Sequence, residues 1–336
     1  MKRIAIVGAT GAVGQEFERV LGERDLRGAE YRLLASARSA GQSLPWLGRS
    51  ITVEELTPDS FAGIDLALFS AGGGISREYA THAVRAGAVV VDNSSAFRMD
   101  PDVPLVVPEV NPEALRGHQG IVANPNCSTI IMVVPLWPLH QKWGLTRVSV
   151  ATYQAASGAG AQALRELDAQ TQTVLDGGAP VPEVFPVACA FNVFSHNTAV
   201  DEETGFNVEE TKMVLETRKI FGAQDLSITT TCMRVPVRRA HLEAIQVEFA
   251  EPVEPDAVRE VLRGAPGVTV VDDRANNDFP TSLTASGIDD VLVGRIRRDP
   301  TVADGRGLQF ICAGDQLRKG AALNAVQIAE ALGAGA

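Results

Sequence analysis

Residues 2–21 read KRIAIVGATGAVGQEFERVL, and this stretch decides the fold. A short apolar strand over residues 2–7 runs directly into a turn with glycines at positions 8, 11 and 14. Phe17, Val20 and Leu21 then recur at helical spacing and form one apolar face. A glycine turn that opens a helix presents free N–H groups and a partial positive charge, which suits a pyrophosphate. The alternative is a purely structural turn in a flavodoxin-like fold, because the spacing is Gly-x-x-Gly-x-x-Gly rather than Gly-x-Gly-x-x-Gly.

The rest of the first third repeats this strand-and-helix pattern. Further apolar strands are predicted over residues 31–35, 64–70 and 88–92, with a helix over about 75–86 after a second glycine turn. Strands that alternate with helices indicate a Rossmann-like, doubly wound parallel sheet. Ligands of such sheets bind at the carboxyl ends of the strands.

The pattern changes near residue 145. Strand-like segments follow at 146–154, 226–236, 241–251, 268–272 and 291–297, with helices predicted over about 158–175, 208–221 and 255–263. This combination predicts a second, α+β domain with a mixed or antiparallel sheet. Residues 317–332 are predicted to form an amphipathic helix that packs back on the first domain. We therefore expect one domain of residues 1–126 plus 318–336 and a second of residues 127–317.

Composition excludes several classes of function. The net charge of −11 disfavours nucleic acid and anionic membranes as partners, since both attract basic surfaces. The basic start is followed by an apolar stretch that stops at Gly8, too short for a signal peptide, so we expect a cytoplasmic protein without a membrane span. Its four cysteines lie far apart, which predicts free thiols and no metal site.

The end of the second predicted strand indicates which dinucleotide binds. An NAD site usually carries a carboxylate there for the ribose 2′-hydroxyl. Residues 35–41 read ASARSAG instead, with Ser36, Arg38 and Ser39 and no carboxylate. An arginine flanked by hydroxyls suits a 2′-phosphate, so we predict NADP as the cofactor. The alternative is that Arg38 is a solvated surface arginine.

A single cysteine stands in the heptapeptide ANPNCST, residues 123–129. If a helix begins at Cys127, its dipole lowers the pKa of the thiol and favours the thiolate. Most free cysteines are inert core residues, but this one follows a turn and turns often carry function. A nucleophilic cysteine beside a nicotinamide cofactor indicates a thiohemiacetal and thioester route.

That route needs a proton carrier, and the chain has five histidines. His82 and His140 fall within helical patterns, and His118 lies in a polar loop. His241 starts a strand after the arginine-rich segment MRVPVRRA, so it is our candidate general acid and base. No role is assigned to His196.

Six segments in order, GATGAVG, NPNCST, TYQAASGAG, NVEETKM, MRVPVRRAH and LRKGAALNAVQIAE, closely resemble the bacterial type of aspartate-semialdehyde dehydrogenase. The resemblance spans nearly the whole chain. It implies reversible, NADPH-dependent reduction of L-aspartyl 4-phosphate to L-aspartate 4-semialdehyde and phosphate, on the route to lysine through diaminopimelate, methionine and threonine. It also implies a homodimer formed through the second domain, which would be both catalytic and dimerising.

The resemblance carries roles to individual residues of this sequence. Cys127 resembles the nucleophile, Gln154 the glutamine that orients the intermediate, and His241 the acid and base. Arg234 resembles the residue that pairs with the substrate α-carboxylate. The other expected substrate ligands are Arg98 and Lys212 for the phosphate and Glu209 for the ammonium. Glu210 is the rival of Glu209, but Glu209 and Lys212 are spaced to share a helical face.

Further cofactor contacts follow from the same resemblance. They are Gly8, Thr10, Gly11, Ala12 and Val13 in the first turn, Ser70, Ala71 and Gly72 in the third-strand turn, Asn93 after the fourth strand, and Ser157, Gly158 and Gln316 near the nicotinamide.

One segment departs from the family wording, VFSHNTAVDEETGFN at 193–207. We expect it to alter a surface or dimer loop and to leave the chemistry unchanged.

Two other functions remain as alternatives. N-acetyl-glutamyl-phosphate reductases share the fold and the thioester chemistry, but their nucleophile lies in a PGCYPT-like segment, unlike NPNCST. A non-catalytic homologue should have lost reactive groups that are all present here.

Overall fold

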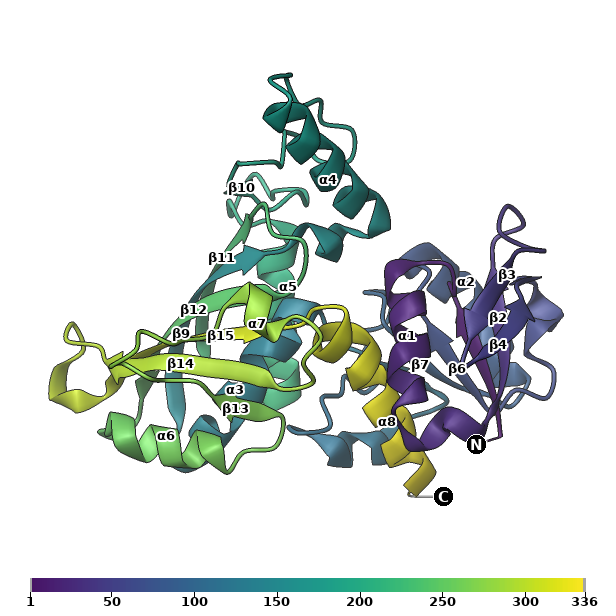
Figure 1. The fold of residues 1–336 in the computed structure, drawn as a ribbon. Helices are drawn as coiled ribbons and strands as arrows, with labels where there is room; N and C mark the ends of the chain where they lie inside the picture. Colours follow the sequence, from purple (N-terminus) through teal and green to yellow (C-terminus); the bar gives the residue numbers. More distant parts are fainter. Residues whose placement is uncertain (1, 335–336) are drawn as a thin grey trace. The chain divides into compact units, whose positions relative to one another are not determined.

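The structure is a computed structural model and describes residues 2–334. The chain divides into two compact units, Met1–Asn126 with Gly320–Ala336, and Cys127–Lys319. We call them unit 1 and unit 2 and describe each by itself (Figure 1). Within the described residues, no helix combines the length and apolar character needed to span a bilayer.

Unit 1 is built on a parallel sheet with the strand order β5-β2-β1-β6-β7-β8. Its strands are β1 (Arg3–Val7), β2 (Glu30–Ala35), β5 (Glu54–Glu55), β6 (Leu66–Phe69), β7 (Val89–Asp92) and β8 (Ile121–Ala123). A separate hairpin pairs β3 (Ser43–Trp46) with β4 (Arg49–Thr52). The chain leaves β1 for β2 on one side and returns to β6 on the other. The point between β1 and β6 is therefore the place where doubly wound sheets bind ligands.

Helices cover both faces of this sheet, which confirms the predicted Rossmann-like fold. Alternate residues of β1 serve the two faces, as the two-residue period of a strand requires. Ile4 and Ile6 pack in one core cluster with α1 (Ala12–Gly22) and α8 (Leu323–Ala334). Ala5 and Val7 pack in a second cluster with α2 (Gly73–Arg85). Short 3-10 segments at Asp25–Gly28, Pro58–Phe61 and Pro112–Gly117 complete the connections.

The C-terminal helix packs on unit 1 as expected, but it is not amphipathic. It opens with a π-helical turn, η6 (Arg318–Ala322), and most of α8 is buried all round. Asn324 is fully buried because its Nδ2 donates to the Val106 carbonyl at 3.0 Å and to Asn124 Oδ1 at 2.6 Å. Hydrogen bonds thus hold this polar side chain inside unit 1.

Unit 2 contains a mixed seven-stranded sheet in the order β10-β11-β9-β12-β15-β14-β13, as the strand pattern predicted. The strands are β9 (Leu145–Gln154), β10 (Phe194–Ser195), β11 (Ser227–Arg234), β12 (His241–Phe249), β13 (Val268–Val270), β14 (Val291–Arg298) and β15 (Gly307–Gly314). β11 runs parallel to β9 and β13 parallel to β14, and the other pairs are antiparallel. The prediction missed β10, which is too short to recognise, and β15, whose ends are glycines that weaken a strand pattern.

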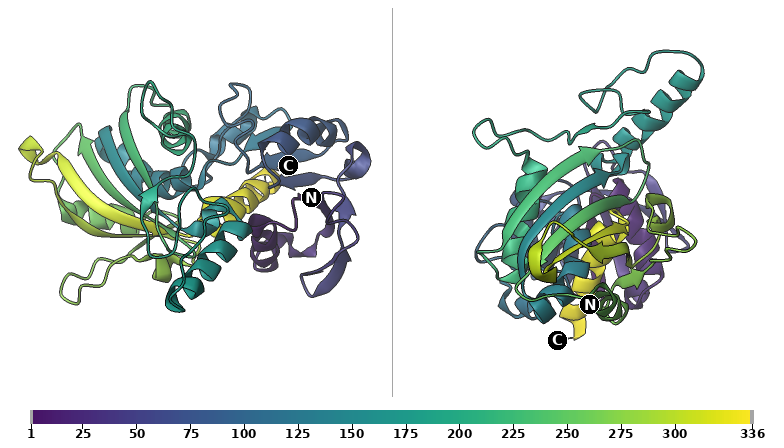
Figure 2. Two further views of the ribbon diagram at one scale, coloured as in Figure 1. Left: turned by 90° about the horizontal axis from the view of Figure 1, so that it is seen from above. Right: turned by 90° about the vertical axis from the view of Figure 1, so that its left-hand side faces the viewer.

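Three helices pack against this sheet and one another: α3 (Cys127–Trp143), α5 (Val208–Phe221) and α6 (Pro255–Arg263). Along β12, every second residue from His241 to Phe249 is buried, and the residues between are partly exposed. The 3-10 turn η4 (Ala156–Ala159) leads into α4 (Ala161–Leu175), which extends with its following loop beyond the sheet (Figures 1 and 2). The remaining pieces are α7 (Ser282–Ala285) and the turn η5 (Ala303–Gly305).

The first turn of unit 1 leaves no space for a side chain at Gly14. A Cβ there would lie 2.3 Å from the Gly8 carbonyl oxygen and 2.7 Å from that of Ala9. We predict that Gly14→Ala lowers the free energy of unfolding by about 1–3 kcal/mol through overpacking. Urea denaturation followed by circular dichroism measures this.

Gly74 in α2 is the matched control, because a Cβ there would meet no atom within 4 Å. Gly74→Ala should be neutral or stabilise by up to about 1 kcal/mol, since alanine is the better helix former. Equal destabilisation by both substitutions would contradict the close approach at Gly14.

Candidate active site

The cofactor residues predicted in unit 1 meet at one edge of its sheet. The turns that carry them directly follow β1, β2, β6 and β7, which are neighbours in the parallel sheet. The carboxyl ends of parallel neighbours share an edge, so the structure brings these four turns together.

The turns after β1 and β6 are in backbone contact. Gly8 has a φ of +88°, and its N–H donates to the Leu34 carbonyl at 2.8 Å. A Cβ at Gly8 would lie 2.4 Å from the Ser70 carbonyl oxygen, so only glycine fits there. Gly11 caps α1 without a side-chain hydrogen bond. The first N–H groups of α1 therefore remain available to an anion such as a pyrophosphate.

The turn after β2 presents the residues predicted to select NADP. The N–H groups of Ser39 and Ala40 donate to the Ser36 carbonyl at 2.8 and 3.1 Å, which closes a tight turn. Arg38 lies at its exposed tip, and its side chain makes no hydrogen bond or ion pair with the described residues. The arrangement fits a 2′-phosphate at this turn because the cation is not already paired.

Asn93 and Arg98 are held together after β7. Asn93 Nδ2 donates to the Phe69 carbonyl at 3.1 Å, and its Oδ1 accepts from Asn124 Nδ2 at 2.7 Å. Arg98 is mostly buried and donates to the carbonyls of Asn124 at 2.9 Å and Asn93 at 2.7 Å. The guanidinium is thereby fixed between the segments that follow β7 and β8.

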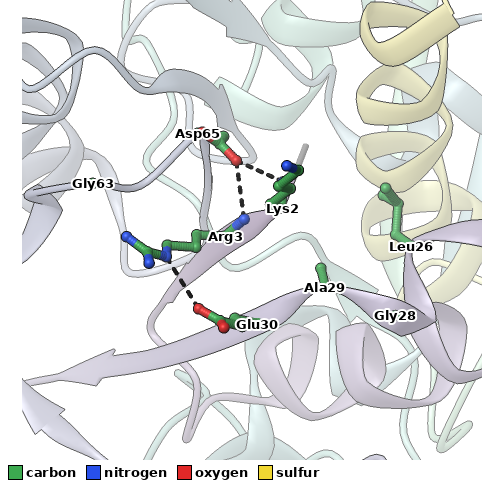
Figure 3. Close-up of a pocket in the computed structure, with 8 residues that line it drawn as sticks. All are labelled: Lys2, Arg3, Leu26, Gly28, Ala29, Glu30, Gly63 and Asp65. Carbon is green, nitrogen blue, oxygen red and sulfur yellow. Dashed lines mark hydrogen bonds and ion pairs between the residues drawn. The ribbon is translucent and has the colours of Figure 1, made fainter.

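The opposite edge of the sheet carries a surface pocket of about 570 Å³ (Figure 3). Asp65 accepts the backbone N–H groups of Lys2 at 2.6 Å and Arg3 at 3.0 Å, and these bonds lower the pKa of its carboxyl. The Arg3 guanidinium pairs with Glu30 at 3.0 Å. These charged groups satisfy one another at the amino ends of the strands, so the pocket offers little to a ligand.

The predicted nucleophile and proton carrier meet in unit 2. Cys127 is the first residue of α3, and its Sγ lies 3.5 Å from Nε2 of His241 at the start of β12. The ring of His241 is fully buried, and its Nδ1 accepts the Ala155 N–H at 3.0 Å. The proton of the neutral ring therefore sits on Nε2 and faces the sulfur. Burial, reinforced by the charge of Arg234, lowers the pKa of His241 to about 3.

Gln154 lies beside this pair at the end of β9. Its Nε2 is 3.5 Å from His241 Nε2 and donates to Glu209 Oε1 at 3.2 Å. Its Oε1 accepts from Thr152 Oγ1 at 3.2 Å, which fixes the orientation of the amide. The amide thus lies between His241 and the predicted ammonium ligand, and its hydrogen bond goes to Glu209.

The two neighbouring glutamates of α5 have different surroundings. Glu209 is buried, contacts Gln154 and pairs with Lys212 Nζ at 3.3 Å. Glu210 accepts the N–H of Asn207 at 2.8 Å as part of a capping box and that of Cys232 at 2.9 Å. Glu209 therefore lies in the cluster of predicted site residues, whereas Glu210 accepts hydrogen bonds from backbone N–H groups.

Arg234 is 1% exposed and is held by three acceptors. Its Nη1 donates to the Ala155 carbonyl at 2.6 Å, and its Nη2 donates to His196 Nε2 at 2.8 Å and to Asn197 Oδ1 at 2.9 Å. Segment 193–207 therefore does more than form a surface loop, because His196 and Asn197 contact a predicted substrate ligand; the expectation that it leaves the chemistry unchanged stays a prediction. His196 precedes Arg234 by 38 residues and reaches it through the pairing of two-residue β10 with β11, which no local pattern revealed.

The residues expected near the nicotinamide adjoin this cluster in unit 2. Gln316 Nε2 donates to Ser157 Oγ at 2.5 Å, and its Oε1 accepts the Ala240 N–H at 2.7 Å. A Cβ on Gly158 would lie 3.1 Å from His241 Cε1 and 3.3 Å from Arg234 Nη1. The turn that carries Ser157 and Gly158 therefore packs directly against the reactive side chains.

Cys127 is the only partly exposed cysteine within residues 2–334; Cys189, Cys232 and Cys312 are buried. Burial raises the pKa of Cys189 to about 11 and also raises those of Cys232 and Cys312. Those three thiols are therefore poor nucleophiles. The described part of the chain contains no group of three or more His, Cys, Asp or Glu side chains placed to hold a metal ion.

Two buried histidines predict a pH dependence of stability. Burial lowers the pKa of His196 to about 4 and that of His241 to about 3, so both stay neutral in the folded chain while unfolded histidine protonates near pH 6.5. Their contribution is present above about pH 6.5 and is lost as the pH falls toward 4. Each changes the free energy of unfolding by up to about 1.4 kcal/mol per pH unit.

Urea denaturation at pH 7, 6 and 5 should show a smaller slope for His196→Gln than for the wild type, because the variant lacks one titrating ring. Identical slopes would mean that His196 is protonated in the folded protein.

Comparisons with known proteins identify the family of this chain. Two family models match the chain: "Semialdehyde dehydrogenase, NAD binding domain" over residues 3–118 and "Semialdehyde dehydrogenase, dimerisation domain" over residues 136–319. An aspartate-semialdehyde dehydrogenase of Synechocystis is 53% identical over 98% of this chain and 97% of its own.

Solved structures are similar over nearly the full length. Aspartate semialdehyde dehydrogenase II of Vibrio cholerae, complexed with ASA, is 42% identical with a TM-score of 0.95, covering 99% of this chain and 98% of its own. The aspartate semialdehyde dehydrogenase of Candida albicans with NADP is 26% identical with a TM-score of 0.76, covering 99% of both chains. The identity to the relatives and the match of both family models lead to one conclusion: this chain is an enzyme of the aspartate-semialdehyde dehydrogenase family.

Proposed function

We propose that this chain catalyses the reversible, NADPH-dependent reduction of L-aspartyl 4-phosphate to L-aspartate 4-semialdehyde and phosphate. The observation that carries the proposal is the approach of Cys127 Sγ to His241 Nε2 at 3.5 Å, with Gln154 within 3.5 Å of the same nitrogen. In this proposal unit 1 binds NADP and unit 2 performs the chemistry.

The reaction begins at Cys127. Its thiolate attacks the acyl carbon, a C–S bond forms, and the C–O bond to the phosphate breaks, so that phosphate leaves and a thioester remains. NADPH, when bound, would supply a hydride to the carbonyl carbon of this thioester. Breakage of the C–S bond then releases the aldehyde and returns Cys127 as thiolate. With the ring neutral, His241 holds its Nε2–H toward the sulfur and stabilises the thiolate by a hydrogen bond, while transfer of a proton as acid and base is the role that the family resemblance implies for it.

The charges of aspartyl phosphate match the predicted ligands. Arg234 offers a cation to the α-carboxylate, and buried Glu209 offers an anion to the ammonium. Arg98 and Lys212 are the cations we assign to the phosphate. In this proposal a few local cations bind the anionic groups of the substrate, although the net charge of the chain is −11.

We also propose a cytoplasmic homodimer formed through unit 2. The match to a dimerisation domain over residues 136–319 supports it. So do the exposed apolar side chains concentrated between α4 and α5, which include Leu175, Val181, Phe191, Val193 and Val200. Light scattering on the purified protein would give twice the chain mass; the single-chain mass would exclude the dimer.

The reaction is tested in the direction of aldehyde oxidation. Aspartate semialdehyde, phosphate and NADP should yield NADPH, the rate should depend on phosphate, and Cys127→Ala should abolish it. N-acetylglutamyl semialdehyde should be a poor substrate. Activity that persists in Cys127→Ala would refute the thioester route, and preference for the acetylated substrate would favour the reductase alternative.

The choice of NADP is tested at Arg38. Arg38→Asp should raise KM for NADPH at least tenfold, since a charge-assisted hydrogen bond contributes about 1.5–3 kcal/mol, while KM for NADH changes little. Arg116→Asp, the same charge change on an exposed arginine of the 3-10 segment Pro112–Gly117, serves as the control. An equal change in KM for NADPH and NADH in Arg38→Asp would contradict the assignment of Arg38 to the 2′-phosphate.

The neighbouring glutamates of α5 form a matched pair. Glu209→Gln should lower kcat/KM for aspartate semialdehyde at least tenfold, because the ammonium loses its charged partner. Glu210→Gln should leave kcat/KM within about twofold but cost about 1 kcal/mol of stability, since a capping interaction weakens. Steady-state kinetics and urea denaturation of both variants decide between them. The reverse pattern would make Glu210 the substrate ligand.

A further inference from the structure

The guanidinium of Arg234 is surrounded by uncharged acceptors. Its partners are the Ala155 carbonyl, a ring nitrogen of His196 and the amide oxygen of Asn197. No carboxylate of residues 2–334 forms an ion pair with it, and its buried Nε–H has no hydrogen-bond partner among them. Neutral acceptors satisfy N–H groups without cancelling the charge, so the guanidinium keeps both its charge and a donor for an incoming anion.

The ring of His196 can only accept from Arg234. A guanidinium offers donors alone, so Nε2 of His196 carries the lone pair and the neutral ring carries its proton on Nδ1. That Nδ1 lies 3.2 Å from Thr198 Oγ1, to which it donates. Burial lowers the pKa of His196 to about 4, so near neutral pH the ring adds no second positive charge beside Arg234.

The same segment also contacts α5. Thr198 Oγ1 accepts the N–H of Glu209 at 3.3 Å, so one short segment connects the predicted carboxylate ligand with the predicted ammonium ligand. Its backbone is fixed to β11, because the His196 N–H donates to the Cys232 carbonyl at 2.9 Å and Phe194 pairs with Arg234. His196 is therefore placed by the sheet, and Asn197 follows it directly in the chain.

We propose that His196 and Asn197 are positioning residues that aim the Arg234 guanidinium and, being uncharged, reserve its charge for the α-carboxylate of the substrate. This inference rests on the proposed function and names how that site selects substrates. The site then favours amino aldehydes that carry a free carboxylate over analogues that lack it. A carboxylate at either position would pair with Arg234 and compete with the substrate.

The experiment compares two substrates that differ only in that carboxylate, aspartate semialdehyde and 3-aminopropanal. Asn197→Asp keeps the side-chain shape and adds a charge. It should lower kcat/KM for aspartate semialdehyde at least tenfold, mostly through KM, and change kcat/KM for 3-aminopropanal less than twofold. Asn192→Asp adds the same charge to exposed Asn192, which donates to the Ala188 carbonyl, and should leave both values unchanged.

Two substitutions of His196 give a second, independent test of the positioning role. His196→Leu removes the acceptor and should cause the same carboxylate-specific loss, whereas His196→Gln supplies an amide oxygen and should restore most of the wild-type value. An equal loss on both substrates, or no loss in Asn197→Asp, would overturn the proposal, because a merely structural role does not distinguish the two aldehydes.

Binding to the Cys127→Ala protein separates this proposal from the proposed function. Calorimetry should give at least tenfold weaker binding of aspartate semialdehyde when Asn197→Asp is added to that background. If the wild type fails to oxidise aspartate semialdehyde but this difference in binding is found, the proposed reaction fails and the positioning role stands. Equal binding with and without Asn197→Asp overturns the positioning role.

Discussion

The peptide groups of Ala155 determine how the reactive side chains of unit 2 are oriented. Its N–H donates to His241 Nδ1 at 3.0 Å, and its carbonyl accepts from Arg234 Nη1 at 2.6 Å. The first bond fixes the ring proton on Nε2, toward Cys127, and the second fixes the guanidinium. Gln316 fixes the backbone just before His241, because its Oε1 accepts the N–H of Ala240. Ala240 has a φ of +67°, which is unusual for alanine. Both hydrogen bonds are made by the backbone of Ala155, whose side chain is fully buried.

The site also explains how an acidic protein binds an anion. The net charge of −11 sets the field far from the protein, but recognition depends on a few local cations. Arg234 is held by neutral acceptors, so these partners do not cancel its charge. Lys212 and Glu209, which are both predicted substrate ligands, are paired with each other at 3.3 Å. Arg234 thus has neutral partners, whereas Lys212 has a charged one.

Local patterns in the sequence predicted much of this structure. The strand and glycine turn of residues 2–21 indicated the doubly wound sheet, and the Ser-Thr after Cys127 correctly suggested a helix start, because these features depend on neighbours in the chain. What escaped prediction depends on contacts between distant residues. The burial of α8 follows from packing on the sheet of unit 1, and the contact of His196 with Arg234 follows from a two-residue strand. Adjacent Glu209 and Glu210 look alike in the sequence and differ only in their partners.

In the proposed reaction Cys127 carries the acyl group, and mass spectrometry of the whole protein would detect it there. When the protein is mixed with aspartate semialdehyde and NADP without phosphate, a burst of NADPH no larger than the chain concentration should accompany an aspartyl thioester on Cys127. Addition of phosphate should then remove the adduct. NADPH formation without an adduct on Cys127, or an adduct that persists elsewhere in Cys127→Ala, would contradict the account.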